Sequence, residues 1–241
     1  MKINGLKAGF RSLSRGDMCG RFSLDRSAEI IEARFKAKLR IQNATLPLCN
    51  IGPGMETIAI PMDDPEGIGL YTWGLAEYSR DGKSRNLINA RCETYHQKWP
   101  FKSLVRKNRC LVPATGYIEW KLMGTRKIPY LIQPADNSLF AFAGLFEESS
   151  GKRRFTILTR PAGAVSGQIH DRMPVILDSE FESRWMNPDQ DPGELGPLLL
   201  ALPEGSLHAF SVSTAINASF ANNPDFLKPC SYSFPEQLKL F

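Results

Sequence analysis

Short apolar segments separated by turn residues constrain the fold of this 241-residue chain more than any other feature. Their length and their enrichment in β-branched and aromatic residues are typical of strands. Pairs such as Gly124-Thr125 and Gly151-Lys152 mark turns between them. The expected strands are Thr57–Met62, Ile68–Leu75, Cys110–Ile118, Tyr130–Gln133, Leu139–Phe146, Phe155–Thr159 and Val175–Leu177.

A few helices are expected between and beside these strands. From Asp25 to Arg40, the residues Ile31, Phe35 and Leu39 recur every four positions, which is typical of one apolar helix face. Further helices are expected at Tyr95–Lys107, Ser179–Met186 and Gly193–Leu202. Many short strands with interspersed helices favour an α+β fold: a single domain with a curled mixed β-sheet or distorted barrel and several flanking helices.

The composition narrows the class of protein. The five cysteines are widely spaced and form no C-x-x-C pair, and the three histidines do not stand at metal-ligand offsets from them. We therefore expect reduced thiols, no metal and no cofactor. The sequence contains no apolar run of about 20 residues, the length that crosses a bilayer. We expect a cytoplasmic protein that does not use a membrane.

The first seventeen residues differ from the rest. They carry +3 of the formal net charge of +5, which leaves +2 for residues 18–241. They also lack the apolar core of a secretory signal. We therefore expect residues 1–17 to be an extension outside the domain, either a mis-called start or a removed segment, and residues 18–241 to form the domain.

Cys19 directly follows Met18, and this pair makes an N-terminal cysteine available. If translation starts at Met18 and the methionine is removed, residue 19 carries both an α-amine and a β-thiol. The pKa of an α-amine is about 7.7–8.0, so much of it is nucleophilic at neutral pH. An amine and a thiol on neighbouring carbons can trap an aldehyde as a five-membered ring. A Met-Cys pair alone is also compatible with an ordinary core cysteine.

Four motifs in order resemble the SRAP family, the SOS-response-associated peptidase domains. The resemblance runs from Met18 to about Ser213, and Asn50–Gly54 and Trp73–Leu75 also look like family landmarks. The four motifs are Cys19-Gly20-Arg21-Phe22, Ile88-Asn89-Ala90-Arg91-Cys92-Glu93-Thr94, Arg109–Pro113 running to Gly116–Trp120, and Ile169–Leu177.

The resemblance implies a protein that recognises abasic sites in single-stranded DNA. It implies that Cys19 forms a thiazolidine with the ring-opened sugar aldehyde. Asn89 would hold the amine or the sugar oxygen, Glu119 would move the amine proton, and His170 would act as acid or base in sugar opening. The peptidase activity in the family name is understood as removal of residues before the cysteine.

The same resemblance suggests DNA contacts. Arg21 and Arg91 would clamp phosphates. The block Lys152–Arg154 is a weaker candidate, for which a solvated hairpin tip is the simpler reading. The remaining expected contacts are Trp73, Tyr78, Trp120 and Arg172. The expected partner is single-stranded DNA with an abasic site, bound by a monomer that associates with the nucleoid.

Simpler structural roles stand beside these. Asn89 can satisfy backbone groups at a strand end, and Glu119 can be a solvent-facing strand residue. Arg91 and Arg172 can pair with Glu93 or Asp171, and the tryptophans can pack in the core. Two other functions also fit: a cysteine amidohydrolase or processing peptidase with Cys19 as nucleophile, and a non-catalytic single-strand binder.

Overall fold

Five strands of the chain close into a barrel. The computed structural model describes residues 19–41, 45–78, 84–201, 205–218 and 221–233. The barrel strands follow one another as β13, β12, β9, β4 and β5, and β5 pairs with β13 to complete the ring. Four of the five pairings are antiparallel, and the closing one is parallel. The strands are β4 (Glu56–Pro61), β5 (Gly67–Trp73), β9 (Arg109–Ala114), β12 (Phe140–Ser149) and β13 (Lys152–Pro161).

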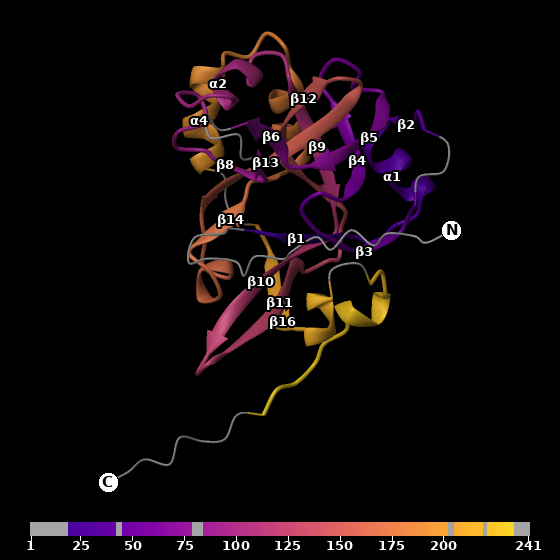
Figure 1. Cartoon of the computed structure of the whole chain (residues 1–241), viewed down its shortest axis with the longest axis vertical. Coiled ribbons are helices and arrows are strands. Elements are labelled where there is room, and N and C mark those ends of the chain that lie inside the picture. The colour runs from indigo at the N-terminus through magenta and orange to yellow at the C-terminus, as the bar shows by residue number, and fades with distance from the viewer. Residues whose placement is uncertain (1–18, 42–44, 79–83, 202–204, 219–220, 234–241) are drawn as a thin grey trace.

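A second sheet extends from the barrel and carries strand β1. Its order is β16-β11-β10-β1-β3, and it lies below the barrel in the view of Figure 1. Only Thr115 separates β9 from β10, so one stretch of chain passes from the barrel into this sheet. The members are β1 (Arg21–Leu24), β3 (Leu48–Ile51), β10 (Gly116–Met123), β11 (Arg126–Pro134) and β16 (Leu207–Ser211).

Shorter elements border these two sheets. The helices are α1 (Ala28–Phe35), α2 (Phe101–Leu104), α3 (Ser179–Met186) and α4 (Pro192–Ala201), with 3-10 turns at Ser166–Gln168, Thr214–Asn217 and Pro224–Leu227. The remaining strands are β2 (Lys38–Leu39), β6 (Leu75–Tyr78), β7 (Ser84–Leu87), β8 (Asn89–Arg91), β14 (Arg172–Pro174) and β15 (Ile176–Leu177). The expected α+β domain with a curled mixed sheet or distorted barrel is therefore confirmed.

Two of the expected helices are shorter than the sequence pattern suggests. The helix expected over Asp25–Arg40 ends at Phe35, because Lys36 takes a left-handed conformation (φ 53°) and caps it. The next residues pair with β5 as β2 instead of continuing the helix. Within Tyr95–Lys107, only α2 is helical and the rest consists of turns. Helix α3 matches its expected bounds.

Aromatic rings fill the barrel beneath β1. Phe22 lies edge-on to Trp73 at 5.1 Å and to Phe142 at 5.7 Å, and Trp73 stacks on Phe155 at 6.2 Å. Trp73 is fully buried, and its indole N–H donates to the carbonyl of Ile88 at 2.9 Å. The DNA contact expected of Trp73 is therefore corrected: the residue is part of the core, where its N–H is already satisfied.

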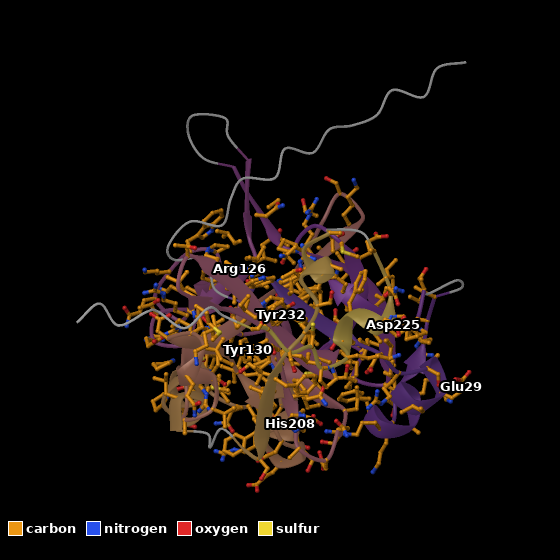
Figure 2. The ribbon with its side chains drawn as sticks, turned by 90° about the horizontal axis from the view of Figure 1, so that it is seen from below. Glu29, Arg126, Tyr130, His208, Asp225 and Tyr232 are labelled. Atoms are coloured by element: carbon orange, nitrogen blue, oxygen red, sulfur yellow. The ribbon has the colours of Figure 1, made fainter. Side chains whose placement is uncertain are left out.

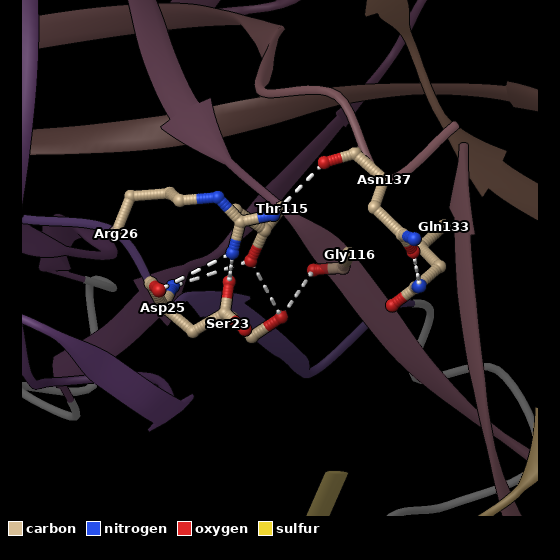
Figure 3. A network of polar contacts seen from close by, with 7 residues as sticks. All are labelled: Ser23, Asp25, Arg26, Thr115, Gly116, Gln133 and Asn137. Carbon is tan, nitrogen blue, oxygen red and sulfur yellow. Dashed lines mark hydrogen bonds and ion pairs between the residues drawn. The ribbon is translucent and has the colours of Figure 1, made fainter. Parts of the chain in front are cut away.

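Hydrogen bonds between polar side chains attach the end of β1 to two of the connections between strands. Figure 3 shows Ser23 and Thr115 joined through their hydroxyls at 3.2 Å, with the backbone N–H of Asp25 also donating to Thr115. Arg26 pairs with Asp25 at 2.6 Å and donates to the carbonyl of Asn137 at 2.8 Å. These contacts fix the exit of β1 between the β9–β10 and β11–β12 connections.

Gly144 tests how tightly the barrel wall is packed. A methyl group at this position would lie 2.8 Å from Sγ of Cys110, 3.0 Å from Cγ2 of Val112 and 3.2 Å from the carbonyl of Thr156. We predict that Gly144→Ala destabilises the fold by about 1–3 kcal/mol, because the barrel must move apart to admit it. Urea denaturation measures the change.

The matched control is Gly193→Ala on α4, where the nearest atom outside the helix is a carboxylate oxygen of Asp191 at 3.4 Å. That carboxylate is on a flexible surface side chain, so alanine should be neutral or slightly stabilising there. Equal effects of the two substitutions would contradict the tight packing inferred for the barrel wall.

Candidate functional site

Both sides of the Cys19 backbone are held by predicted site residues. The backbone N–H of Cys19 hydrogen-bonds to the carboxyl group of Glu119. The side-chain amide of Asn89 donates to the carbonyl of Cys19 at 3.2 Å. The side chain of Cys19 is buried, with its Sγ 3.8 Å from the carbonyl oxygen of Arg21. The structure thus brings together Cys19, Asn89 and Glu119 from three separate motifs.

Strand pairing explains why Glu119 meets Cys19. Strand β1 runs antiparallel to β10 with Arg21 opposite Ile118, so the residues before Arg21 extend alongside Glu119 and Trp120. On β8, Asn89 and Arg91 point to the same side because strand side chains alternate, while Ala90 faces the core. Arg91 is exposed and stands about 7 Å along the strand from Asn89.

Glu119 is a buried acid with an unusual ionisation. It is 3% exposed, which contradicts the solvent-facing alternative, and its Oε1 has no hydrogen-bond partner among the described residues. Burial raises the pKa of Glu119 to about 8, and the negative charge of Asp171 adds to this. Hydrogen bonds from the backbone of Cys19 and Trp120 act in the opposite direction. Near neutral pH this carboxyl is therefore mostly protonated and able to give or take a proton.

The thiol of Cys19 is protonated as well. Burial, followed by the charge of Glu119, raises the pKa of this thiol well above its ordinary value. A thiolate is therefore disfavoured in this position, and a reaction that begins with thiolate attack is not what the site favours.

His170 lies in a turn at the edge of the site. Its Nδ1 accepts from the backbone N–H of Arg172 at 3.1 Å and lies 3.0 Å from a carboxylate oxygen of Asp171. These contacts join His170 to its own turn, and its link to the buried site runs through Asp171, whose charge acts on Glu119.

Two of the arginines expected to bind DNA have structural partners instead. Arg21 is 6% exposed and donates through Nη1 to Asn50 and to the carbonyl of Ile216, both at 2.7 Å. Arg172 forms a two-pronged ion pair with Glu93 and donates to the carbonyl of Thr159 at 2.8 Å. In this structure their guanidinium groups tie β1 and β14 to their neighbours, and the DNA contacts expected of both stay predictions.

The aromatic residues expected to contact DNA differ in their surroundings. Trp120 is half-buried, packs against a small apolar cluster, and donates from its indole N–H to Asn217 at 2.9 Å. Tyr78 ends β6, but its side chain lies outside the described residues. Of the expected DNA contacts, Arg91 alone has a described side chain that is exposed.

Tyr130 is a neighbour of the site that sequence motifs did not single out. It stands directly opposite Glu119 on β11 and is half-buried. Figure 2 labels Arg126 and Tyr130, which both lie on β11, and His208, which lies lower in the view on the neighbouring strand β16. Only the strand register reveals that Tyr130 adjoins Glu119, because eleven positions separate the two residues along the chain.

Within the described residues, no three or more His, Cys, Asp or Glu side chains gather as a metal site would require. Across the same part of the chain, no helix has the length and apolar character needed to span a membrane.

Comparison with known proteins places the site in a family context. The model of the family described as "SOS response associated peptidase (SRAP)" matches residues 18–219. The abasic site processing protein YoqW of Bacillus subtilis is 34% identical over 222 residues, covering 88% of this chain and 99% of that protein. The abasic site processing protein YedK of Escherichia coli is 29% identical, covering 70% of this chain and 79% of its own length.

Solved structures share the fold. The crystal structure of a protein from Bacteroides thetaiotaomicron matches with a TM-score of 0.79 at 25% identity, over 88% of this chain and 100% of that protein's chain. A phage-related protein of Bordetella bronchiseptica has a TM-score of 0.65 at 29% identity, over 81% of this chain and 95% of its own.

The buried carboxyl of Glu119 makes stability depend on pH. Its folded pKa of about 8 lies above the unfolded value of about 4.3, so the unfolded chain loses this proton first as pH rises. Stability should therefore fall between about pH 4.5 and pH 8. We predict that Glu119→Gln removes this loss and gains at most about 5 kcal/mol at pH 8, with little gain at pH 5.

Melting temperatures at the two pH values measure the effect. The chain tested must retain residue 19 in peptide linkage, as in the structure, because a free amine would add a positive charge beside the carboxyl. Glu148→Gln, on an exposed strand end, is the matched control and should shift neither value. A pH-independent effect of Glu119→Gln would contradict the raised pKa.

Proposed function

The chain belongs to the SOS response associated peptidase (SRAP) family, and from this premise we propose that it recognises abasic sites in single-stranded DNA and bonds to them through Cys19. The curated relatives reported above are named abasic site processing proteins. The observation that carries the proposal is the position of Cys19, whose backbone N–H meets a buried, mostly protonated acid.

The backbone N–H of Cys19 marks where an α-amine would stand. Once residues 1–18 are absent, the nitrogen that now hydrogen-bonds to Glu119 becomes the free amine. The pKa of an α-amine is about 7.7–8.0, close to the value of about 8 for Glu119 before this change. Groups of matched pKa exchange a proton at little cost, which suits general acid–base catalysis. Asn89 would hold the Cys19 carbonyl and thereby orient the amine.

The proposed reaction releases one water. The neutral amine adds to the aldehyde carbon of the opened sugar, and its proton passes to the oxygen to give a carbinolamine. Protonated Glu119 then gives its proton to the hydroxyl group, and water leaves an iminium ion. The Cys19 thiol adds to the iminium carbon, and its proton returns to Glu119. The product is a thiazolidine, and the raised pKa of the thiol fits its delivery in the protonated form.

His170 and Arg91 complete the proposal at the rim. His170, held in its turn by the contacts of its Nδ1 with Arg172 and Asp171, would assist opening of the closed sugar. Arg91 is exposed on the same side of β8 as Asn89 and would contact a phosphate next to the lesion. Removal of the residues before Cys19 belongs to the proposal, as does a domain over residues 18–241, of which the family match covers residues 18–219. The proposed location is the cytoplasm, with the protein on nucleoid DNA.

A cysteine peptidase or amidohydrolase is less well supported. Such an enzyme would attack a carbonyl with the thiol, and the raised pKa of Cys19 opposes formation of the thiolate. The peptidase activity in the family name enters the proposal only as removal of residues 1–18 by the chain itself.

Intact mass tests the covalent chemistry. We predict that protein expressed from the full reading frame begins at Cys19 and gains the mass of an abasic-site oligonucleotide minus one water. An oligonucleotide whose aldehyde has been reduced to an alcohol is the control and should give no adduct. A chain that still begins at Met1 would be replaced by one started at Met18, and absence of an adduct there would refute the proposal.

Salt dependence tests Arg91. We predict that Arg91→Ala weakens binding of the reduced oligonucleotide and lowers the slope of log K against log salt by about 0.7, the value for one phosphate on a single strand. Arg40→Ala, on a surface arginine paired with Asp64, is the control and should leave the slope unchanged. Fluorescence anisotropy at several salt concentrations measures both, and an unchanged slope for Arg91→Ala would exclude its phosphate contact.

A further inference from the structure

Trp99 is an exposed aromatic residue in an acid-free basic segment. Trp99 is 70% exposed, more than any other large hydrophobic residue in the described part of the chain. Residues 94–108 contain four cations and no Asp or Glu. The cations are Lys98, Lys102, Arg106 and Lys107. None of them forms an ion pair with a described residue, and all four are exposed.

The core fixes this surface in place. Phe101 and Val105 are buried at positions i and i+4, so one side of the segment packs into the core while the opposite side faces outward. The backbone N–H of Lys102 donates to the carbonyl of Lys98 at 2.8 Å, and this hydrogen bond closes a turn that contains Trp99. The indole is therefore presented by an ordered backbone between two lysines. A ring that only filled space would be buried here, as Phe101 is.

Consecutive turns lead from this surface back to the candidate site. The backbone N–H of Tyr95 donates to the carbonyl of Arg91 at 2.9 Å, and that of Lys98 donates to the carbonyl of Thr94 at 3.1 Å. Figure 1 shows α2 and β8 on the same side of the barrel. A rise of about 1.5 Å per residue in helix-like turns places Lys98 roughly 10 Å from Arg91.

Helix α4 borders the surface on one side. The hydroxyl of Tyr95 donates to the carbonyl of Pro192, and the exposed acids Asp191 and Glu194 lie at the start of this helix. Their negative charge disfavours a phosphate backbone there. The remaining approach runs from Arg91 past Lys98 to Lys102, so the charges favour one path for a polyanion.

We propose that Trp99, with Lys98 and Lys102, binds the single strand on one side of the abasic nucleotide. The indole would stack on an intact base a few nucleotides from the lesion, and the lysines would contact the phosphates around it. Flat aromatic rings interleaved with cations are the usual means of binding single strands without sequence preference. This inference rests on the proposed function, because it assigns a place on the protein to the strand that carries the lesion.

A flank-length series tests the proposal. The probes are oligonucleotides with one reduced abasic site, which cannot form the covalent bond. The 5′ flank and the 3′ flank are each two or ten nucleotides long and are varied independently. Fluorescence anisotropy gives Kd for each. For the wild-type chain we expect lengthening of one side alone to strengthen binding about tenfold, which corresponds to about 1.4 kcal/mol. Trp99→Ala and the double change Lys98→Glu with Lys102→Glu should lose this gain.

Two variants control for the ring and for surface hydrophobicity. Trp99→Phe keeps an aromatic face and should keep most of the gain, whereas Leu122→Ala removes an exposed apolar side chain on the β10–β11 hairpin and should keep all of it. Quenching of tryptophan fluorescence by the long probe should also be weaker in Trp99→Phe than in the wild-type chain. A Trp99→Ala chain that gains as much as wild type from the longer flank would overturn the proposal.

Adduct formation on the shortest unreduced probe separates this inference from the proposed function. Trp99→Ala should form that adduct at the wild-type rate, because Trp99 does not belong to the reacting site. Absence of the adduct from every chain, wild type included, would refute the covalent mechanism, while the flank-length result would still decide the role of Trp99.

Discussion

The pairing of β1 with β10 is the interaction on which the site depends. It places Cys19 beside Glu119 and inserts the Phe22 ring among the barrel aromatics. The same pairing buries the Glu119 carboxyl and so raises its pKa. Arg21 reinforces the arrangement by joining β1 to Asn50 and to the carbonyl of Ile216. The position of Cys19 and the acidity of its neighbour therefore have one structural cause.

Much of the fold could be predicted from local pattern, and the misses have physical reasons. The strand-like runs and α3 were found because alternation and apolar spacing are local properties. Strand β1 is buried throughout and shows no alternation, so its pairing was not apparent. The helix over Asp25–Arg40 was overextended because a left-handed Lys36 and pairing of β2 with β5 override the apolar period.

The motifs predicted which residues lie together better than they predicted the contacts of each residue. Cys19, Asn89 and Glu119 do meet, although each motif alone allowed a structural role. Arg21, Arg172 and Trp73 come from the same set of family-like segments, but their described contacts are with the core and with other structural groups. Burial does not distinguish the two groups, since Glu119 is as buried as Arg21; their contact partners do, and these depend on the tertiary structure. Trp99 lies just outside the motifs, and its binding role is indicated only by its exposure in the tertiary structure.

The central claim is that the α-amine of residue 19 is the first nucleophile and the thiol acts second. Cys19→Ser, in a chain that begins at residue 19, keeps the amine and removes the thiol. Mass spectrometry after incubation with abasic single-stranded DNA, with and without borohydride, separates the two steps. The account predicts an adduct through residue 19 only when borohydride reduces the imine. No trapped adduct, or one attached through a lysine instead, would contradict it.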